Sequence, residues 1–221
     1  MATRQRKSRA RQVAQQLAAH YPEVTCALEF ESPVQLLVAT ILSAQCTDER
    51  VNQVTRVLFA DYPTAADLAA VSQARLEKII QSTGFFRNKA QNIRACCQQL
   101  VEHHRGEVPR DLESLVKLPG VGRKTANVVL GTAFGLPTGV VVDTHVRRIT
   151  QRLGLTENED PVKIEQDLIE QLPSEEWINF SHRLIHLGRQ ICKARRPQCD
   201  DCFLADLCPR VGVEPPARKK T

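Results

Sequence analysis

The sequence predicts an all-α protein, and three observations lead to that fold class. Apolar residues recur every three or four positions along nearly the whole chain, the spacing that places them on one face of a helix. Only the run GVVV at 139–142 reads as extended, and it is too short to build a sheet. The segments between periodic stretches are a few residues long, as is usual where neighbouring helices pack together.

The expected helices are defined by their apolar faces and their ends. Ser32 is a good N-cap and Pro33 fits a first helical position, so a helix should begin there. This helix, residues 33–42, is apolar on all sides and is expected at the centre of a core. Further helices are expected at residues 49–59, 74–80, 88–104, 109–118, 123–134, 144–154, 161–172 and 175–191.

The composition is that of an ordinary globular chain. It has 221 residues, of which 42% are hydrophobic and 25% charged, with a formal net charge of +5. This charge is basic but below the extreme of a histone-like protein, and only 5% aromatic residues argues against a single-strand binder built on base stacking. No apolar run approaches the about 18 residues that a membrane span needs, so no membrane partner is expected.

The first twelve residues, MATRQRKSRARQ, hold five basic side chains and no acid. Two interpretations have equal weight: a solvated, frayed tail, or an arm that binds phosphates. A transit peptide is also rich in arginine and poor in acids. Two locations therefore stay open. In a prokaryote the protein would lie in the cytoplasm with the nucleoid, and otherwise it would be targeted to the nucleus or an organelle.

A glycine turn between two expected helices, LPGVGRKTA at 118–126, is the first candidate site. Gly120 and Gly122 permit unusual backbone angles and leave room for a close approach. Backbone amides that follow such a turn at a helix N-terminus bind phosphate well. The run is not a Walker loop, because Arg123 separates Gly122 from Lys124. It is not a dinucleotide fingerprint either, because Thr125 stands where a third glycine is needed. Nucleic-acid backbone is the remaining phosphate partner.

Lys124 begins what looks like a buried helix, where an ammonium is costly to hold. Partial burial and the positive end of the helix both disfavour the charged form, and only a neutral amine is a nucleophile. From the turn alone, a lysine that contacts phosphate is the more common arrangement.

A second motif, VVVDTHVRR at 140–148, brings Asp143 to the start of a helix. Aspartate is a common N-cap there, and a carboxylate held by helix amides stays ionised, so capping and catalysis are compatible. His145 follows two residues later and is assigned a structural role.

Four of the eight cysteines, Cys192, Cys199, Cys202 and Cys208, lie within seventeen residues near the C-terminus. Their spacing does not suit a zinc ribbon with two separated pairs, and it favours an iron–sulfur cluster. Zinc stays open from spacing alone, and His182 and His186 have the i, i+4 spacing to contribute. The other four cysteines are expected to be buried thiols.

The glycine turn, VDTHVRR and the four cysteines together resemble the helix-hairpin-helix superfamily of DNA glycosylases, specifically the endonuclease III family. The resemblance covers about Pro33 to Cys208. It implies a six-helix barrel at 26–136, which contains the helix-hairpin-helix at 109–135. It also implies a terminal domain, 1–25 and 137–221, whose cluster loop is 192–208, with a cleft between the two domains.

The resemblance also implies roles for single residues. Lys124 is the nucleophile, Asp143 is catalytic, and the four cysteines hold a 4Fe–4S cluster. Gln45, in LSAQCTD, fills the space that a flipped nucleotide leaves, and Phe85 is an apolar wedge where close relatives have leucine. Three residues are expected to line the pocket: Ser43, Asp48 and His145. Phosphate contacts are expected from the glycine turn with Arg123, and from three cations in the cluster loop: Lys193, Arg195 and Arg196.

The implied enzyme is a bifunctional DNA glycosylase and AP lyase of base excision repair. It acts as a monomer on double-stranded DNA that carries oxidised pyrimidines, such as thymine glycol, or abasic sites. An adenine-mismatch glycosylase is disfavoured because Ile41 stands where that enzyme has an acid. A pyrimidine-dimer glycosylase uses the same lysine chemistry and stays open. A non-enzymatic iron–sulfur DNA-binding protein has no need for both Lys124 and Asp143.

Overall fold

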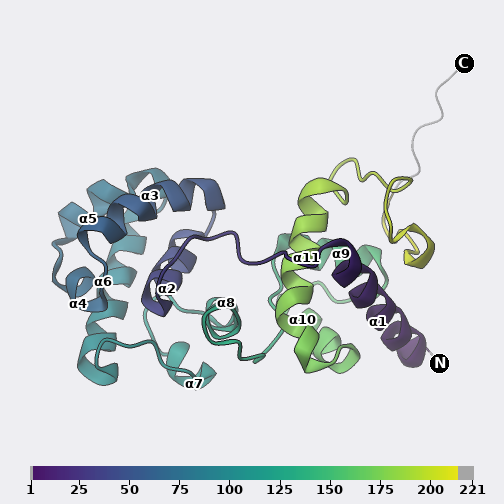
Figure 1. The fold of residues 1–221 in the computed structure, drawn as a ribbon, viewed down its shortest axis with the longest axis horizontal. Helices are drawn as coiled ribbons and strands as arrows, with labels where there is room; N and C mark the ends of the chain where they lie inside the picture. The colour runs from purple at the N-terminus through teal and green to yellow at the C-terminus, as the bar shows by residue number, and fades with distance from the viewer. Residues whose placement is uncertain (1, 214–221) are drawn as a thin grey trace, which may run out of the picture. The chain divides into compact units, whose positions relative to one another are not determined.

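Two groups of helices, each around its own hydrophobic core, make up the part of the chain that the computed structural model describes, residues 2–213 (Figure 1). The central unit is Cys26–Thr138, and the terminal unit is Met1–Thr25 with Gly139–Thr221. No strand forms within residues 2–213, and 139–142 belong to an irregular segment that leads to the next helix. The all-α prediction is confirmed.

The central unit contains seven α-helices and one short 3₁₀ turn. They are α2 (Pro33–Leu42), α3 (Asp48–Asp61), α4 (Ala65–Ala70), α5 (Gln73–Ile80), η1 (Gln81–Thr83), α6 (Phe86–His104), α7 (Leu112–Leu115) and α8 (Arg123–Phe134). The sequence pattern missed α4, because it has only six residues and a capping box, Thr64 with Asp67, starts it rather than a long apolar stripe. The helix expected at 109–118 is only α7, and Asp111 caps it by accepting the Ser114 amide at 2.8 Å.

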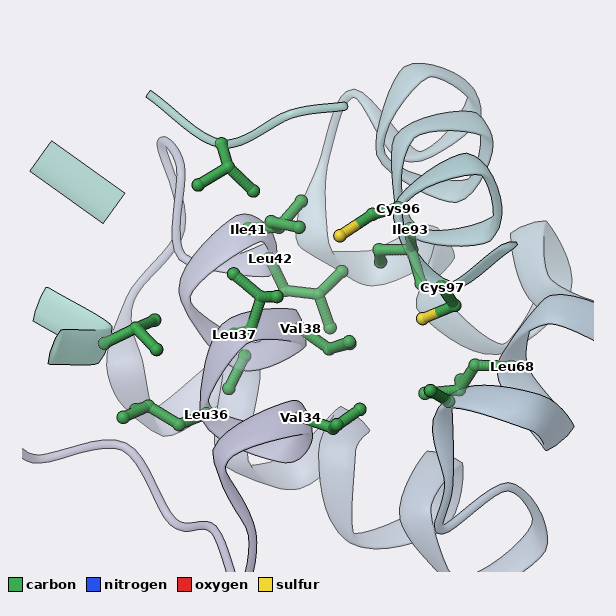
Figure 2. Close-up of a cluster of buried hydrophobic side chains, with 14 of the residues drawn as sticks. Val34, Leu36, Leu37, Val38, Ile41, Leu42, Leu68, Ile93, Cys96 and Cys97 are labelled. Carbon is green, nitrogen blue, oxygen red and sulfur yellow. The ribbon is translucent and has the colours of Figure 1, made fainter. Parts of the chain in front are cut away.

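Helix α2 lies at the centre of this core, as its sequence predicts. Ser32 caps it by accepting the Gln35 amide, Pro33 is its first residue, and nearly every later residue is buried. Its side chains project from several sides, while Leu68 of α4 and Ile93 of α6 lie in the same cluster (Figure 2). A helix that is apolar all round is stable only when neighbours surround it, which α3, α6 and α8 do here.

The terminal unit contains α1 (Ala2–His20), α9 (Thr144–Arg152), α10 (Pro161–Gln171), η2 (Ser174–Glu176), α11 (Trp177–Gln190) and η3 (Ala205–Leu207). Its core holds Phe180, which is fully buried, together with side chains of α1, α9 and α10. No helix in residues 2–213 has both the length and the apolar character to cross a membrane.

The interpretation of the basic N-terminus as a frayed tail is wrong, because α1 is a packed helix. Val13 and Leu17 are fully buried in the terminal unit and form an apolar stripe among the basic residues. Arg9 Nη1 donates to the carbonyl of Leu153 at 3.1 Å, and Arg6 pairs with Glu157. Part of the basic charge therefore holds this helix in place.

The four cysteines outside the C-terminal group differ in burial. Cys96 and Cys97 are fully buried, and burial raises the pKa of Cys96 to about 12 and that of Cys97 further. Cys26 and Cys46 are only half-buried and pack against the central core. All four were expected to be buried thiols, and that expectation holds for the α6 pair alone.

Candidate functional site

The glycine turn joins α7 to α8 and is fixed by two buried apolar residues. Leu118 and Val121 are buried, and the Val121 amide donates to the Leu118 carbonyl at 3.1 Å. Gly120 has a φ of +75°, and a Cβ placed on it would come within 2.8 Å of the Asn92 Cβ. Only glycine fits there, because both the backbone angle and the space exclude a side chain.

Gly122 plays a different part at the same turn. It is the N-cap of α8, no side chain caps this helix, and a Cβ on Gly122 would meet nothing within 4 Å. The first amides of a helix have no partner inside the helix, so this end offers them to an anion. Arg123 and Lys124 are the first two residues of α8, and both are exposed.

Exposure of Lys124 corrects one expectation. The sequence suggested partial burial, but the buried face of α8 begins only at Ala126 and Asn127. The first turn of α8 therefore lies outside the core, and Lys124 is open to solvent in the free protein.

Asp143 belongs to the terminal unit and is the N-cap of α9. Its carboxylate accepts the Val146 amide at 2.8 Å, and its side chain is half-buried after two buried valines, Val140 and Val142. The expected N-cap geometry is confirmed. A carboxylate fixed in this way keeps a defined direction and its negative charge is stabilised by the helix N-terminus.

His145, two residues after Asp143, is held by a neighbour of its own helix. Arg148 Nη2 lies 3.2 Å from its Nδ1, and Gly188 of α11 packs so closely that a Cβ there would come within 2.5 Å of the ring. Burial lowers the pKa of His145, and the Asp143 charge opposes that effect. These contacts agree with a structural role.

Gln45 lies in the loop between α2 and α3. It is exposed and has a φ of +54°, a left-handed conformation that is uncommon outside glycine. Ser43 ends α2, where its hydroxyl donates to the Thr40 carbonyl at 2.8 Å. Asp48 is the first residue of α3, but the cap is Thr47, whose hydroxyl accepts the Arg50 amide. Capping therefore does not account for Asp48.

Phe85 lies in a second left-handed turn, between η1 and α6. Its φ is +46°, it follows Gly84 with φ of +70°, and its side chain is 66% exposed. A large apolar side chain held out on a strained backbone is unusual, and such strain is found most often at functional sites. Gln45 and Phe85 thus share backbone strain and exposure within the same unit.

The four C-terminal cysteines line one hollow together with Arg152. Burial raises the pKa of the Cys202 and Cys208 thiols, and neighbouring cysteine charges raise it further. Among residues 2–213 no three Cys, His, Asp or Glu side chains are arranged around a single metal ion. Four thiolates around a shared hollow repel one another, so they fit a larger cluster that supplies positive iron.

The zinc alternative with two histidines finds no support in the geometry. His186 packs its ring edge-on against Tyr21, with centroids 4.7 Å apart. His182 lies within α11, and burial lowers its pKa. Neither is among the residues around the cysteine hollow.

The cluster loop displays its cations between anchored ends. Lys193, Arg195 and Arg196 are exposed. Arg152 donates to the carbonyls of Lys193 and Ala194 at 2.8 and 2.7 Å. The loop backbone is therefore tied to α9 as well as to its cysteines.

Two further residues, Arg152 and Lys89, are not among the expected site residues. Arg152 ends a helix rich in basic side chains, where nothing distinguishes it from its neighbours. Lys89 is 5% exposed on the buried face of α6, four residues before the fully buried Ile93. A lysine in register with an apolar stripe is the signal that identifies it.

Comparison with known proteins identifies families and a relative that are similar to this chain. Residues 38–174 match the HhH-GPD superfamily of base excision DNA repair proteins, and residues 192–208 match the iron–sulfur binding domain of endonuclease III. Endonuclease III of Synechocystis sp. is 56% identical over 92% of this chain and 93% of its own.

Two solved structures are similar to this chain over nearly its full length. One is a non-covalent endonuclease III–DNA complex, with a TM-score of 0.88, 47% identity, and coverage of 92% of this chain and 95% of that one. The other is a trapped endonuclease III–DNA covalent intermediate, with a TM-score of 0.88, 46% identity, and coverage of 92% and 96%.

Proposed function

The chain belongs to the endonuclease III family of HhH-GPD base excision DNA repair proteins, and we propose that Lys124 carries its chemistry. It is a DNA glycosylase and AP lyase that works on DNA and contains a 4Fe–4S cluster. The observation that carries the proposal is an accessible amine in the first turn of α8, directly after a glycine turn.

Lys124 supplies the electron pair. Its neutral amine attacks C1′ of the deoxyribose, and the bond from C1′ to the base breaks, so the base leaves with the electron pair. The sugar ring opens to give a Schiff base to Lys124. Loss of a C2′ proton then expels the 3′ phosphate, and water hydrolyses the Schiff base to free the lysine. Exposure of Lys124 in the free protein lets it reach a sugar, and bound DNA then excludes water from it.

Asp143 is proposed as the acid–base partner. Its carboxylate accepts a proton from the lysine ammonium and balances positive charge that develops on the sugar. The N-cap hydrogen bond to Val146 holds that carboxylate in one orientation.

The DNA backbone is proposed to bind at two places. The amides after Gly120 and Gly122, with Arg123, take one phosphate of the strand that is cut. The exposed cations of the cluster loop, Lys193, Arg195 and Arg196, take others. This binding weakens as salt rises, because each contact releases a counterion.

A glycosylase must take the damaged nucleotide out of the stack. We assign Gln45 to the space that it leaves and Phe85 to the wedge that separates the neighbouring bases. Ser43, Asp48 and His145 are proposed to line the pocket for the flipped nucleotide. The exposed, left-handed positions of Gln45 and Phe85 support their assignment.

The cluster is proposed to be held by Cys192, Cys199, Cys202 and Cys208, which share one hollow. When bound, its iron neutralises the four thiolates and fixes the loop between the first two of them. The chain's own part is to present the loop cations in one arrangement, with Arg152 holding the loop backbone.

Oxidised and ring-saturated pyrimidines such as thymine glycol, and abasic sites, are the proposed substrates. We propose that the chain acts as a monomer, and that it acts in the cytoplasm on the nucleoid, as suits a chain similar to bacterial enzymes.

The test is borohydride reduction with a duplex that contains one abasic site. The parent protein should form a covalent adduct, Lys124→Ala none, and Asp143→Asn an adduct about 100-fold more slowly. Lys117→Ala is the matched control, since Lys117 is an exposed lysine of the same hairpin that pairs with Glu113 at 2.8 Å. A persistent adduct in Lys124→Ala would contradict the proposal, and a thymine glycol duplex tests the substrate class separately.

A further inference from the structure

Lys89 is a buried lysine that the proposed chemistry does not use. It lies one turn into α6 and is 5% exposed. Its Nζ donates to two backbone carbonyls, those of Leu42 and Thr83, both at 2.8 Å. A buried ammonium is retained only where such partners replace water, so these bonds hold both chain segments firmly.

The two carbonyls belong to the ends of two different elements. Leu42 is the last residue of α2, and Thr83 is the last residue of η1. Helix ends leave carbonyls without partners, and a cation is stabilised at the negative end of a helix. Because one nitrogen binds both oxygens, the two chain ends are held within two hydrogen-bond lengths of each other.

Each of these ends leads directly to a proposed DNA-inserting residue. Gln45 follows Leu42 by three positions, and Phe85 follows Thr83 by two. The backbone amide of Lys89 also donates to the Phe85 carbonyl at 3.1 Å. Both residues have positive φ, a conformation that persists only where the surrounding structure fixes it.

We infer that Lys89 is a positioning residue that sets the spacing between Gln45 and Phe85, the two side chains that enter the DNA. The inference rests on the proposed function, because it assigns Lys89 a role only through these two residues. Burial lowers the pKa of Lys89, and the half-buried Cys46, next to Gln45, opposes that effect.

The first experiment compares two substrates for Lys89→Met, which keeps the length of the side chain but removes the donors. A single-stranded abasic oligonucleotide needs no base flipping, so its borohydride adduct should match the parent. Excision from a thymine glycol duplex should fall about tenfold, because misplaced groups far from the reacting atoms slow the reaction. Lys78→Met, at an exposed lysine of α5, is the matched control and should change neither.

The second experiment asks whether Lys89 acts through Gln45 and Phe85. In a Gln45→Ala/Phe85→Ala background, Lys89→Met should reduce duplex excision by less than about twofold, since coupled residues are not additive. A 2-aminopurine opposite the lesion reports unstacking directly, and its fluorescence rise on binding should be smaller in Lys89→Met than in the parent.

The outcomes separate the inference from the proposed function. If the parent forms no adduct with either substrate, both fail. If the parent reacts, the inference alone is overturned by equal losses on both substrates, by full duplex activity in Lys89→Met, or by an additive effect in the Gln45→Ala/Phe85→Ala background.

Should Lys89→Met not fold, Lys89→Arg tests the inference instead, since it keeps the charge but moves the donors. Its duplex excision should fall about threefold with the single-strand adduct unchanged, and full duplex activity overturns the inference.

Discussion

Arg152 contacts the first of the four clustered cysteines: its Nη1 donates to the Cys192 sulfur at 3.3 Å. Its own carbonyl lies 3.4 Å from the Cys208 sulfur and accepts the amide of Val211 at 3.1 Å. One residue of α9 therefore contacts the first and the last cysteine of the group. Residues that contact metal ligands orient them and adjust their electron density.

Arg152→Met should weaken retention of the cluster. The variant keeps the packing of the side-chain stem but loses the hydrogen bonds to Cys192 and to the loop carbonyls. Iron and sulfide should be released to a chelator about tenfold faster than from the parent, as is usual when a residue behind a metal ligand is lost. Arg147→Met, at an exposed arginine of the same helix, is the control. Equal release from both variants would show that Arg152 does not support the cluster.

The two glycines of the hairpin turn should respond differently to alanine. Gly120→Ala combines a left-handed φ with a 2.8 Å approach to the Asn92 Cβ, so it should lower the free energy of unfolding by about 2–3 kcal/mol. Gly122→Ala meets no atom and should cost at most about 1 kcal/mol as an N-cap substitution.

Gly122→Ala should reduce DNA affinity although it costs little stability. The added Cβ would occupy space that a phosphate needs. Gly122→Ala should bind an abasic duplex more weakly by about tenfold, or about 1.4 kcal/mol, the loss of a charge-assisted contact. Thermal unfolding and fluorescence anisotropy are the measurements. Unchanged affinity in a folded Gly122→Ala protein would argue against phosphate binding at this turn.

Gln45→Gly should make the protein more stable and less active. Glycine adopts positive φ without the penalty that Gln45 carries, so the free energy of unfolding should rise by up to about 1 kcal/mol, less the added freedom of the unfolded chain. Excision from duplex DNA should fall, because the side chain that fills the flipped-out position is gone. Arg105→Gly is a matched control, since Arg105 also has positive φ, +56°, at the exposed C-terminal end of α6. A loss of excision in the control as large as in Gln45→Gly would show that strain alone, and not this side chain, matters.

Much of the fold follows from local sequence rules. Helix α2 is apolar on all sides, is capped by Ser32 and begins with Pro33. These features predict a buried central helix, and the structure has one. Asp143 is recognisable as an N-cap for the same reason, because short-range side-chain chemistry decides it. Helix α1 escaped prediction because five basic residues hide the stripe that contains Val13 and Leu17.

The candidate site is less predictable where long-range packing decides it. Exposure of Lys124 depends on where the neighbours of α8 stop covering it, and periodicity does not report this within one turn. The bonds from Lys89 to Leu42 and Thr83 join chain segments 47 and 6 residues away, so no local pattern contains them. The left-handed conformations of Gln45 and Phe85 could not be predicted from the sequence either, since neither residue type favours a positive φ.

Stability should depend on pH through His182. Burial lowers the pKa of His182 in α11, so the folded protein binds its proton less readily than the unfolded chain. The contribution of neutral His182 to the free energy of unfolding is therefore complete above the pKa of the unfolded chain, about 6.5. It is lost as the pH falls from there to the lower pKa of the folded protein. His182→Gln should flatten the slope of unfolding free energy against pH in that window, although it lowers the plateau. The half-buried His145, whose pKa is also lowered by burial, leaves part of the slope in place. An equal slope in the parent and in His182→Gln would contradict the assignment.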